Sequence, residues 1–294
     1  MHRFPFANVL GRSCGLMALC LCLVGREAPA DTRVISLAPN LTELVYALGF
    51  GQHLVGRSSA CDYPTGALDV TVVGGFGRPN WEALINLQPD WVIATDLEKP
   101  GLMKQLERHG IRALTLPCES WAELIEAAQQ IASALGAPER ADAWIATMTS
   151  RKEALRDQTR AFWADRDPLT LYAEVWGQPI MTPGRRSFLH EVILWTGADS
   201  LSTRLPTRYQ SVSTEWLVEQ NPDVILLAYM VSDYAVADRL RQRLGWSRIR
   251  ALQTNQIIDD IDPDWLLRPG PRLIKGAEAL AERLRAIALG DEVE

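Results

Sequence analysis

Short apolar runs typical of strands alternate with amphipathic stretches typical of helices along most of the chain. Runs such as residues 33–37, 91–95 and 224–229 are rich in valine, isoleucine and leucine and have the length of buried strands. Helical periodicity appears in stretches such as residues 121–136. Because such alternation is typical of parallel sheets with helices on both faces, the pattern predicts an α/β protein.

One unit of this pattern occurs twice, at residues 77–96 and again at residues 209–230. Each copy has a capping residue, a short amphipathic helix, a Pro-Asp break and an apolar run of strand type. At a constant offset of 133 positions the copies align Asn80 with Ser213, Glu82 with Glu215, Leu84 with Leu217, Pro89 with Pro222 and Asp90 with Asp223. The repeat predicts two similar lobes, and two lobes with a cleft between them are more typical of a binding protein than of an enzyme.

No turn signal interrupts residues 138–163, so they are expected to form a single helix about 38 Å long. A helix of that length is too long to be a connector inside one small lobe. The predicted architecture is α/β, with two Rossmann-like lobes that have central parallel-type sheets and are joined by one long interlobe helix. The expected domains are an N-terminal lobe at residues 31–137, the interlobe helix at 138–167 and a C-terminal lobe at 168–294.

The first 30 residues have the features of a secretory signal peptide. Arg3 and Arg12 precede an apolar run at residues 14–24, which is too short to span a membrane, and an Ala-Pro-Ala sequence ends at Ala30. We therefore expect cleavage after Ala30 and export to the periplasm. Removal of this segment takes three arginines and one glutamate from a formal net charge of −6, which leaves −8. A nucleic-acid partner is not expected for so acidic a protein.

Two cysteines, Cys61 and Cys118, remain after residues 1–30 are removed. An even number of cysteines in an exported protein is consistent with one disulfide. Both residues follow predicted strands of the first lobe, so they could meet at one edge of its sheet. The alternative is two buried free thiols. A free thiol would also permit another class of function, an exported α/β enzyme with Cys61 or Cys118 as its nucleophile.

Other catalytic and metal-binding patterns are missing from residues 31–294. His53, His109 and His190 are isolated, and none has the spacing of a metal site. These residues contain no Gly-x-Ser-x-Gly sequence, no phosphate-binding loop and no Gly-x-Gly-x-x-Gly sequence. We expect a binding protein with no metal site and no cofactor, rather than an enzyme.

Aromatic residues gather in loops that are predicted to lie at the ends of strands. The members of this group are Tyr63, Phe76, Trp176, Tyr209 and Trp265. In doubly wound sheets, ligands bind at the carboxyl ends of the strands, where such loops meet. We expect the group to contact a large, flat, partly apolar ligand. For any one of these side chains alone, packing against a small satellite core is the alternative.

Asp264 and Arg268 lie four residues apart in the loop predicted at residues 262–272. A carboxylate and a guanidinium at this spacing, just before a proline turn, could bind amide groups of a ligand. The alternative is a local ion pair that stiffens the loop.

Glu82 and Glu215 occupy the same position in the two repeat units, the second residue of a predicted helix. A carboxylate there interacts favourably with the helix dipole, which is one explanation of its presence. The other is that the two glutamates, one on each lobe, dock onto basic pockets of a two-fold symmetric partner.

Asn40 and Glu43 have the spacing of a capping box. In such a box the asparagine caps the helix and the glutamate binds back to the backbone of the cap. We therefore expect a helix that is capped by Asn40 and stopped by Gly49 and Gly51.

Taken together, these segments resemble the periplasmic binding proteins that serve cobalamin and iron–siderophore importers. The resemblance covers essentially all of residues 31–294 and rests on the order and spacing of both repeat units. The segments that carry it are residues 33–49, 61–64, 73–94, 211–226 and 264–280, together with the long helix. Within the class, the Asp-Tyr-Pro sequence at 62–64 and the Asp-Trp-x-x-Arg sequence at 264–268 look most like the cobalamin-binding members.

The resemblance implies roles for individual residues. Tyr63 would contact the corrin ring or its lower base, and Asp264 and Arg268 would hydrogen-bond to the side-chain amides of the corrin. Phe76 and Tyr209 stand where the cobalamin-binding members have tryptophans, which changes the wall of the pocket. The ligands left open are cobalamin, another corrinoid such as cobinamide, a haem and a ferric siderophore.

The resemblance also implies a partner. Glu82 and Glu215 match the glutamates that engage arginines on the permease dimer of an ABC importer. The expected protein is a monomer that captures its ligand in the periplasm, in a largely preformed cleft, and delivers it to the importer. In its cysteines the chain departs from the class, because Cys61 and Cys118 lie elsewhere than the disulfide expected there.

Overall fold

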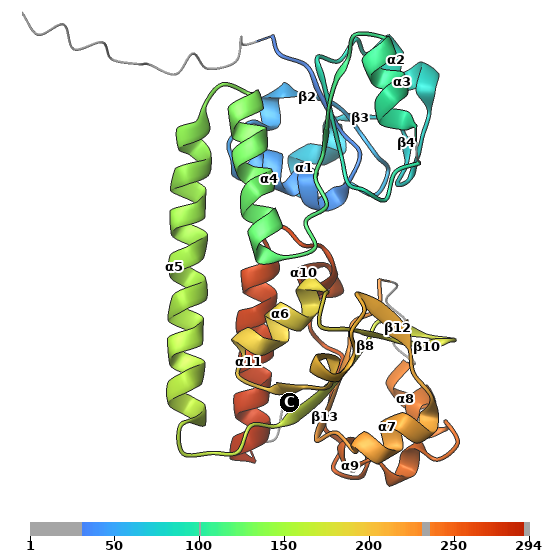
Figure 1. Ribbon diagram of the computed structural model, residues 1–294, viewed down its shortest axis with the longest axis vertical. Coiled ribbons are helices and arrows are strands. Elements are labelled where there is room, and N and C mark those ends of the chain that lie inside the picture. The colour runs from blue at the N-terminus through green and yellow to red at the C-terminus, as the bar shows by residue number, and fades with distance from the viewer. Residues whose placement is uncertain (1–30, 100, 231–235, 291–294) are drawn as a thin grey trace, which may run out of the picture.

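The computed structural model describes residues 31–99, 101–230 and 236–290. These residues form two α/β lobes, and helix α5 (Pro138–Trp163) runs along both of them (Figure 1). The predicted architecture of two lobes with central parallel sheets and one long helix is confirmed. The predicted signal peptide at residues 1–30 lies outside the described residues.

The N-terminal lobe is built on a parallel sheet of five strands in the order β3-β2-β1-β6-β7. These strands are β1 (Val34–Ser36), β2 (Leu54–Arg57), β3 (Thr71–Val72), β6 (Trp91–Ala94) and β7 (Arg112–Thr115). A short antiparallel hairpin consists of β4 (Gly74–Gly75) and β5 (Arg78–Pro79). The helices are α1 (Pro39–Ala47), α2 (Trp81–Asn86), α3 (Leu102–Arg108) and α4 (Trp121–Ala134). Helices α1 and α4 cover one face of the sheet, and α2 and α3 cover the other.

The C-terminal lobe is built on a parallel sheet of four strands in the order β11-β8-β13-β14. These strands are β8 (Thr170–Glu174), β11 (Asp199–Ser200), β13 (Val224–Leu227) and β14 (Ile257–Ile258). The helices are α6 (Phe188–Trp195), α7 (Thr214–Gln220), α8 (Val236–Arg241), α9 (Arg250–Gln253), α10 (Pro263–Leu267) and α11 (Leu273–Leu289). Helices α6, α10 and α11 pack with α5 on one face, and α7, α8 and α9 pack on the other.

Two segments that the sequence pattern assigns to loops have regular structure. Strands β9 (Trp176–Gly177), β10 (Ile180–Pro183) and β12 (Tyr209–Ser211) form a small antiparallel sheet at residues that are rich in turn formers. Helix α10 occupies part of the loop predicted at residues 262–272, and Asp262 caps it by accepting a hydrogen bond from the Asp264 N–H at 3.0 Å. Elements of two to five residues are too short for a hydrophobic period to reveal them.

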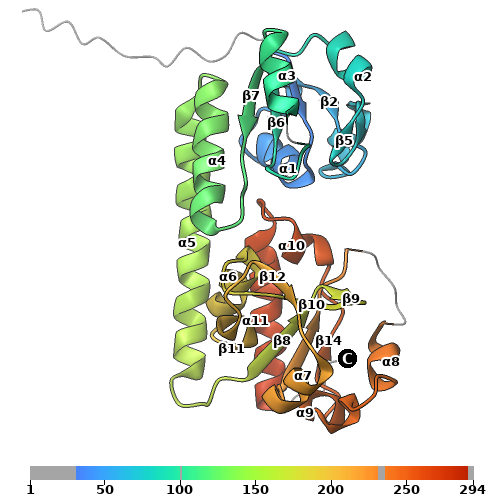
Figure 2. The same cartoon turned by 45° about the vertical axis from the view of Figure 1, so that its right-hand side comes forward.

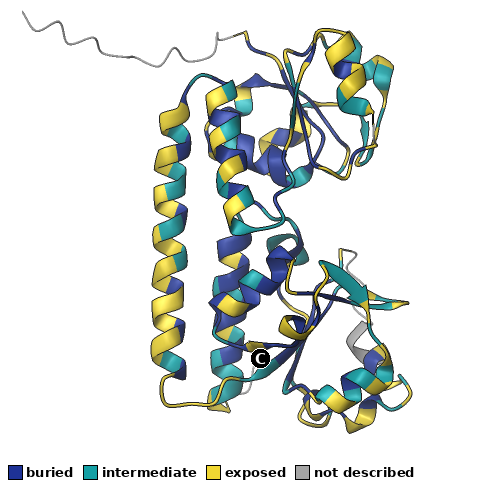
Figure 3. Cartoon of the chain, viewed as in Figure 1, coloured by how far each residue is buried: buried dark blue, intermediate teal, exposed yellow. Residues whose placement is uncertain are grey.

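Helix α5 contributes to the apolar cores of both lobes (Figure 3). Ala141 belongs to the core of the N-terminal lobe, and Leu155 and Trp163 belong to that of the C-terminal lobe. Trp121 and Trp144 pack against both cores. Since both cores are sealed against one helix, the spacing of the lobes follows from its rise of about 1.5 Å per residue.

The two copies of the repeated unit fold alike at their helices. Asn80 and Ser213 are the N-caps of α2 and α7, and each side-chain oxygen accepts a hydrogen bond from a backbone N–H, at 3.0 and 3.2 Å respectively. Leu84 and Leu217 are both fully buried. The sequence repeat is therefore also a repeat of caps and core positions.

Asp90 and Asp223 make the same contacts in the two lobes. Asp90 Oδ2 accepts a hydrogen bond from the Arg33 N–H at 2.8 Å, and Asp223 Oδ2 accepts one from the Thr170 N–H at 2.9 Å. The backbone N–H of Asp90 also donates to the Arg33 carbonyl, and that of Asp223 donates to the Thr170 carbonyl. The Pro-Asp break thus ties the start of β6 or β13 to the strand that opens its lobe.

The capping box predicted at Asn40 and Glu43 is wrong. Helix α1 begins at Pro39, its N-cap is Ala38, and no side chain caps it. Proline is favoured at the first helical position, because the N–H that it lacks would have no partner inside the helix. The side chains of Asn40 and Glu43 reach the C-terminal lobe instead.

The disulfide considered for Cys61 and Cys118 is not formed, and the alternative of two buried free thiols holds, because both cysteines are free and buried. They follow β2 and β7, and three strand spacings, about 14 Å in total, separate those strands in the sheet. A disulfide requires Cα atoms within about 7 Å of each other. Cys61 Sγ lies 3.1 Å from Ser58 Oγ instead.

Thiol titration tests this correction. In a protein of residues 31–294, we expect two reactive thiols after denaturation without reductant and none in the native state, because both side chains are 0% exposed. The control is the same titration after reduction, which should also give two. A denatured, unreduced sample without reactive thiols would show that the cysteines are bonded.

Candidate functional site

The junction between the lobes lies at the carboxyl ends of the parallel strands. Strand β1 leads into α1, which lies on the side of the N-terminal lobe nearest the other lobe, and α10 lies on the facing side of the C-terminal lobe (Figure 2). This is the edge of a doubly wound sheet at which ligands bind. The candidate site is therefore built from loops and short helices of both lobes.

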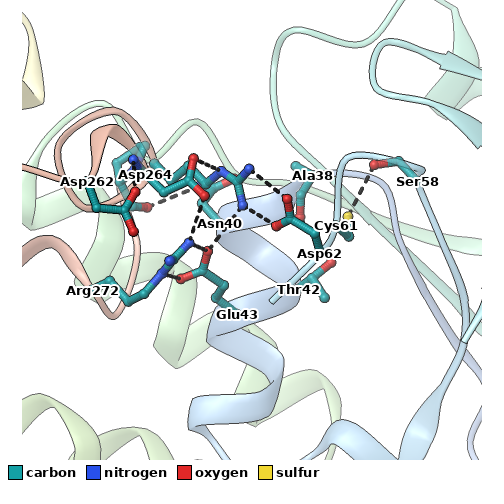
Figure 4. Close-up of polar contacts among 12 residues, drawn as sticks. Ala38, Asn40, Thr42, Glu43, Ser58, Cys61, Asp62, Asp262, Asp264 and Arg272 are labelled. Atoms are coloured by element: carbon teal, nitrogen blue, oxygen red, sulfur yellow. Dashed lines mark hydrogen bonds and ion pairs between the residues drawn. The ribbon is translucent and has the colours of Figure 1, made fainter. Parts of the chain in front are cut away.

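Five charged side chains form one network at this junction (Figure 4). Glu43 and Asp62 come from the N-terminal lobe, whereas Asp264, Arg268 and Arg272 come from the C-terminal lobe. Arg272 donates from Nε and Nη2 to the two oxygens of Glu43, at 2.8 and 2.7 Å. Arg268 donates from Nη1 and Nη2 to the two oxygens of Asp62, at 2.5 and 3.2 Å. Two forked guanidinium–carboxylate contacts therefore cross from one lobe to the other.

The network is unevenly buried. The side chains of Glu43 and Arg272 are 2% and 13% exposed, whereas that of Asp62 is 51% exposed. Burial raises the pKa of Glu43 and that of Asp264, and the neighbouring arginines only partly oppose this effect. The hydrogen bond from Arg268 lowers the pKa of Asp62. Glu43 therefore depends on Arg272 to offset the cost of desolvating its carboxylate.

Two further contacts join α1 and the loop at residues 58–64 to the segment around Arg272. The Arg272 Cζ atom lies 4.3 Å from the ring centroid of Tyr63, which is a cation–π distance. Asn40 Nδ2 donates a hydrogen bond to the Pro269 carbonyl at 3.2 Å. Tyr63 is thereby held against the charged network while 47% of its surface stays exposed.

A second bridge crosses the junction at Arg208, just before β12. Arg208 Nη1 lies 3.3 Å from Glu119 Oε1 and 3.7 Å from Asp96 Oδ2, both in the N-terminal lobe. Burial, together with the nearby Glu119 charge, raises the pKa of Tyr209. Tyr209 therefore lies half-buried beside this bridge as a neutral phenol.

The aromatic side chains that are predicted to contact the ligand differ in exposure, since some are exposed and others are half-buried. Tyr63, Phe76 and Trp176 are 47%, 40% and 52% exposed. Phe76 lies in the β4–β5 hairpin, and Trp176 opens β9 directly after the carboxyl end of β8. Trp265 is half-buried against the core of the C-terminal lobe, with Lys275 Nζ 3.6 Å from its ring centroid.

The structure joins some of the predicted site residues and separates others. Tyr63, Asp264 and Arg268 belong to one connected cluster. Phe76, Trp176 and Trp265 lie on separate elements, the first in the N-terminal lobe and the other two in the C-terminal lobe.

Sequence reasoning did not assign Asp62, Glu43 and Arg272 to the site. The capping-box interpretation gives Glu43 a local role at the start of its helix. A usable signal was present, because Glu43 is the one charged residue in the otherwise apolar or neutral helix Pro39–Ala47. Such a carboxylate is expected to be paired when it is buried.

Glu82 and Glu215 occupy equivalent exposed positions on the first turns of α2 and α7. Hydrogen bonds from its own backbone N–H and from Ser213 lower the pKa of Glu215. Both glutamates are therefore surface charges at helix N-termini, as expected from the repeat.

The described part of the chain has neither a cluster of metal ligands nor a helix that could span a membrane. No group of three or more His, Cys, Asp and Glu side chains there could hold a metal ion. Among the same residues, no helix combines the length and the apolar composition needed to cross a membrane.

Comparison with known proteins identifies the class. The model of the periplasmic binding protein family matches residues 34–263. The chain is 32% identical over 257 residues to the uncharacterized ABC transporter substrate-binding lipoprotein YvrC of Bacillus subtilis, a match that covers 86% of this chain and 79% of that protein.

Two solved structures are similar to this chain over most of its length. The periplasmic vitamin B12 binding protein BtuF of Vibrio cholerae aligns with a TM-score of 0.73 and 28% identity, covering 87% of this chain and 97% of that one. A periplasmic heme binding protein from Pseudomonas aeruginosa aligns with a TM-score of 0.76 and 27% identity, covering 89% and 94%.

The chain belongs to the periplasmic binding protein family. It is an extracytoplasmic ABC transporter substrate-binding protein of the class that serves cobalamin, haem and siderophores, and it is not an enzyme. The hypothesis of an exported thiol-dependent enzyme is therefore wrong. The chemistry of Cys118 agrees, because burial raises the pKa of its thiol to about 12, whereas a nucleophilic cysteine must ionise.

Loss of Arg272 tests how much the buried pair contributes to stability. Arg272→Met should lower the free energy of unfolding by about 3–5 kcal/mol, because the buried Glu43 loses both hydrogen bonds of its forked contact and keeps only a 3.9 Å ion pair with Arg268. Arg151→Met is the matched control. It breaks a pair with Glu278 whose side chains are 43% and 41% exposed, so a loss of about 0–1 kcal/mol is expected. Urea unfolding followed by circular dichroism measures both, and equal losses would contradict a special role for Arg272.

Proposed function

We propose that this protein captures a corrinoid, cobalamin, in the periplasm and delivers it to an ABC importer. The observation that carries the proposal is the mixed-charge cluster of Asp62, Asp264 and Arg268 beside the exposed ring of Tyr63. Its carboxylates and N–H groups suit primary amides, which the corrin carries around its rim, and Tyr63 offers a flat apolar surface. The likeness to the vitamin B12 binding protein of Vibrio cholerae supports this assignment.

The remaining aromatic residues complete the proposed site. Phe76 and Trp176, both exposed, would contact opposite sides of the corrin from the two lobes. Tyr209 and Trp265 are half-buried, so their contribution would be the wall behind the contact surface. In this proposal Asp264 and Arg268 hydrogen-bond to the corrin amides, and no bond is made or broken.

A haem or a ferric siderophore is the second candidate. The haem alternative is favoured by the likeness to the heme binding protein from Pseudomonas aeruginosa, at an identity within one percentage point of that to the vitamin B12 binding protein. Direct ligand binding separates the candidates.

Ligand titration of residues 31–294 tests the proposal. Cyanocobalamin should quench tryptophan fluorescence to saturation, after correction for its own absorbance, and haemin and a ferric hydroxamate should not. Tyr63→Ala should weaken cyanocobalamin binding about tenfold, as expected for an aromatic anchor worth roughly 1–2 kcal/mol. Tyr63→Phe keeps the ring and should bind nearly as the wild type does. Saturable binding of haemin or the siderophore without cyanocobalamin would overturn the corrinoid assignment.

Glu82 and Glu215 are proposed to dock onto the permease dimer of the importer. One exposed carboxylate stands on each lobe at the equivalent helix turn, which matches a partner with two-fold symmetry. The permease would contribute basic pockets, since charge complementarity orients such an encounter.

Charge reversal tests the docking surface. Glu82→Lys with Glu215→Lys should abolish ligand uptake by cells and leave the ligand affinity of the purified protein unchanged, because both side chains lie outside the proposed site. Glu107→Lys with Glu219→Lys is the matched control, with two other exposed glutamates, one on each lobe. Normal uptake with the first pair would rule out the docking role.

We also propose how the chain is cleaved, how it is divided into domains, and its oligomeric state and location. Residues 1–30 would be removed as a signal peptide, and residues 31–137 and 168–294 would form the lobes on either side of the segment 138–167. The mature protein would be a periplasmic monomer. The alternative location is a lipid anchor, as the name of the Bacillus subtilis relative states for that protein.

A further inference from the structure

The donors of Arg268 are mostly taken by carboxylates of the protein itself. Its Nη1 and Nη2 donate to both oxygens of Asp62, and its Nε lies 2.9 Å from Asp264 Oδ1. A guanidinium has five N–H groups in a fixed fork, so these contacts leave two N–H groups of Arg268 without a hydrogen bond to the protein, although Nη1 also lies 3.9 Å from Glu43 Oε1. The bidentate edge that would grip a ligand carboxylate is occupied by Asp62.

The donors of Arg272 are likewise occupied by carboxylates of the protein. Its Nε and Nη2 bind Glu43, and its Nη2 also lies 3.5 Å from Asp264 Oδ2. The ring of Tyr63 covers one face of the guanidinium at 4.3 Å. With a side chain only 13% exposed, Arg272 positions Tyr63 and neutralises Glu43 rather than meeting a ligand directly.

The network carries three carboxylates and two guanidinium groups, a formal excess of one negative charge. Asp62 is its most exposed member, at 51% of the side chain against 30% for Asp264 and 18% for Arg268. The free acceptor positions of Asp62 are therefore the part of the network most open to a ligand beside Tyr63.

From this arrangement we infer that Asp62 determines specificity, favouring ligands with neutral amides over ligands with carboxylates. The inference rests on the proposed function and names the chemistry that the site selects. A primary amide can donate an N–H to Asp62 and accept from a remaining N–H of Arg268. A carboxylate can accept from Arg268 but has no N–H to donate to Asp62, and it enters a region of net negative charge.

Two matched ligands test the inference. Cyanocobalamin and its monocarboxylic acids, in each of which one side-chain amide is hydrolysed, differ by one amide and one charge. With the separated isomers at neutral pH and fixed salt, the wild type should prefer cyanocobalamin to at least one isomer. Asp62→Asn should reduce that preference about tenfold or more, the size expected for one charge-assisted hydrogen bond gained or lost. Because the measured quantity is the ratio of the two affinities, a change in lobe spacing that weakens the binding of both ligands equally does not alter it.

Asp69→Asn is the matched control, because it removes the same charge from an exposed position on the same segment, seven residues away. It should leave the preference unchanged. An equal effect of Asp62→Asn and Asp69→Asn, or no effect of either, would overturn the inference. Thermal unfolding of each variant confirms that it is folded.

A wrong corrinoid assignment and a wrong role for Asp62 give different experimental results. If the wild type does not bind cyanocobalamin, the corrinoid assignment falls, and haemin, with its two propionates, becomes the probe for Asp62. A higher haemin affinity in Asp62→Asn than in the wild type would then support the role of Asp62, and an unchanged affinity would overturn it.

Discussion

The buried ion pair between Glu43 and Arg272 is the contact on which the arrangement of the lobes depends. It joins α1, the first helix of the N-terminal lobe, to the residue that caps α11, the last helix of the C-terminal lobe. A carboxylate that is 2% exposed cannot be left without a partner, so the two lobes must meet closely enough to form the forked contact. The loop carrying Asp62 and Tyr63 is positioned by the same pair, because Tyr63 lies over Arg272.

Helix α5 supplies the complementary constraint. It seals the apolar cores of both lobes, so it limits how far they can separate, whereas the ionic contacts at the junction limit how they can rotate. The second bridge, from Arg208 to Asp96 and Glu119, lies at a different pair of loops. Fixed at more than one point, the junction holds polar groups in place before any ligand arrives, which lowers the entropic cost of binding.

The repeat shows how one local solution serves two lobes. Asp90 and Asp223 bind the backbone at the start of β1 and β8, and Asn80 and Ser213 cap the helices that precede them. The lobes then diverge where the site is built, with a hairpin at β4–β5 in one and a small antiparallel sheet in the other. Common backbone chemistry thus supports different loops, which is where binding specificity is expected to lie.

The sequence by itself determined the two-lobe plan, the long helix and the repeated caps, because these follow from hydrophobic period, turn residues and matched spacing along the chain. It also identified Tyr63, Asp264 and Arg268 as residues of interest. Only the tertiary structure decided that Glu43 crosses to Arg272, that Asp62 occupies Arg268, and that Cys61 and Cys118 stay apart. Partners more than 200 positions apart leave no local pattern, and a carboxylate three residues after an asparagine looks the same whether it caps a helix or pairs across lobes. The distance between the two cysteines could not be predicted for a similar reason. It depends on the order of the strands in the sheet, which differs from their order along the chain.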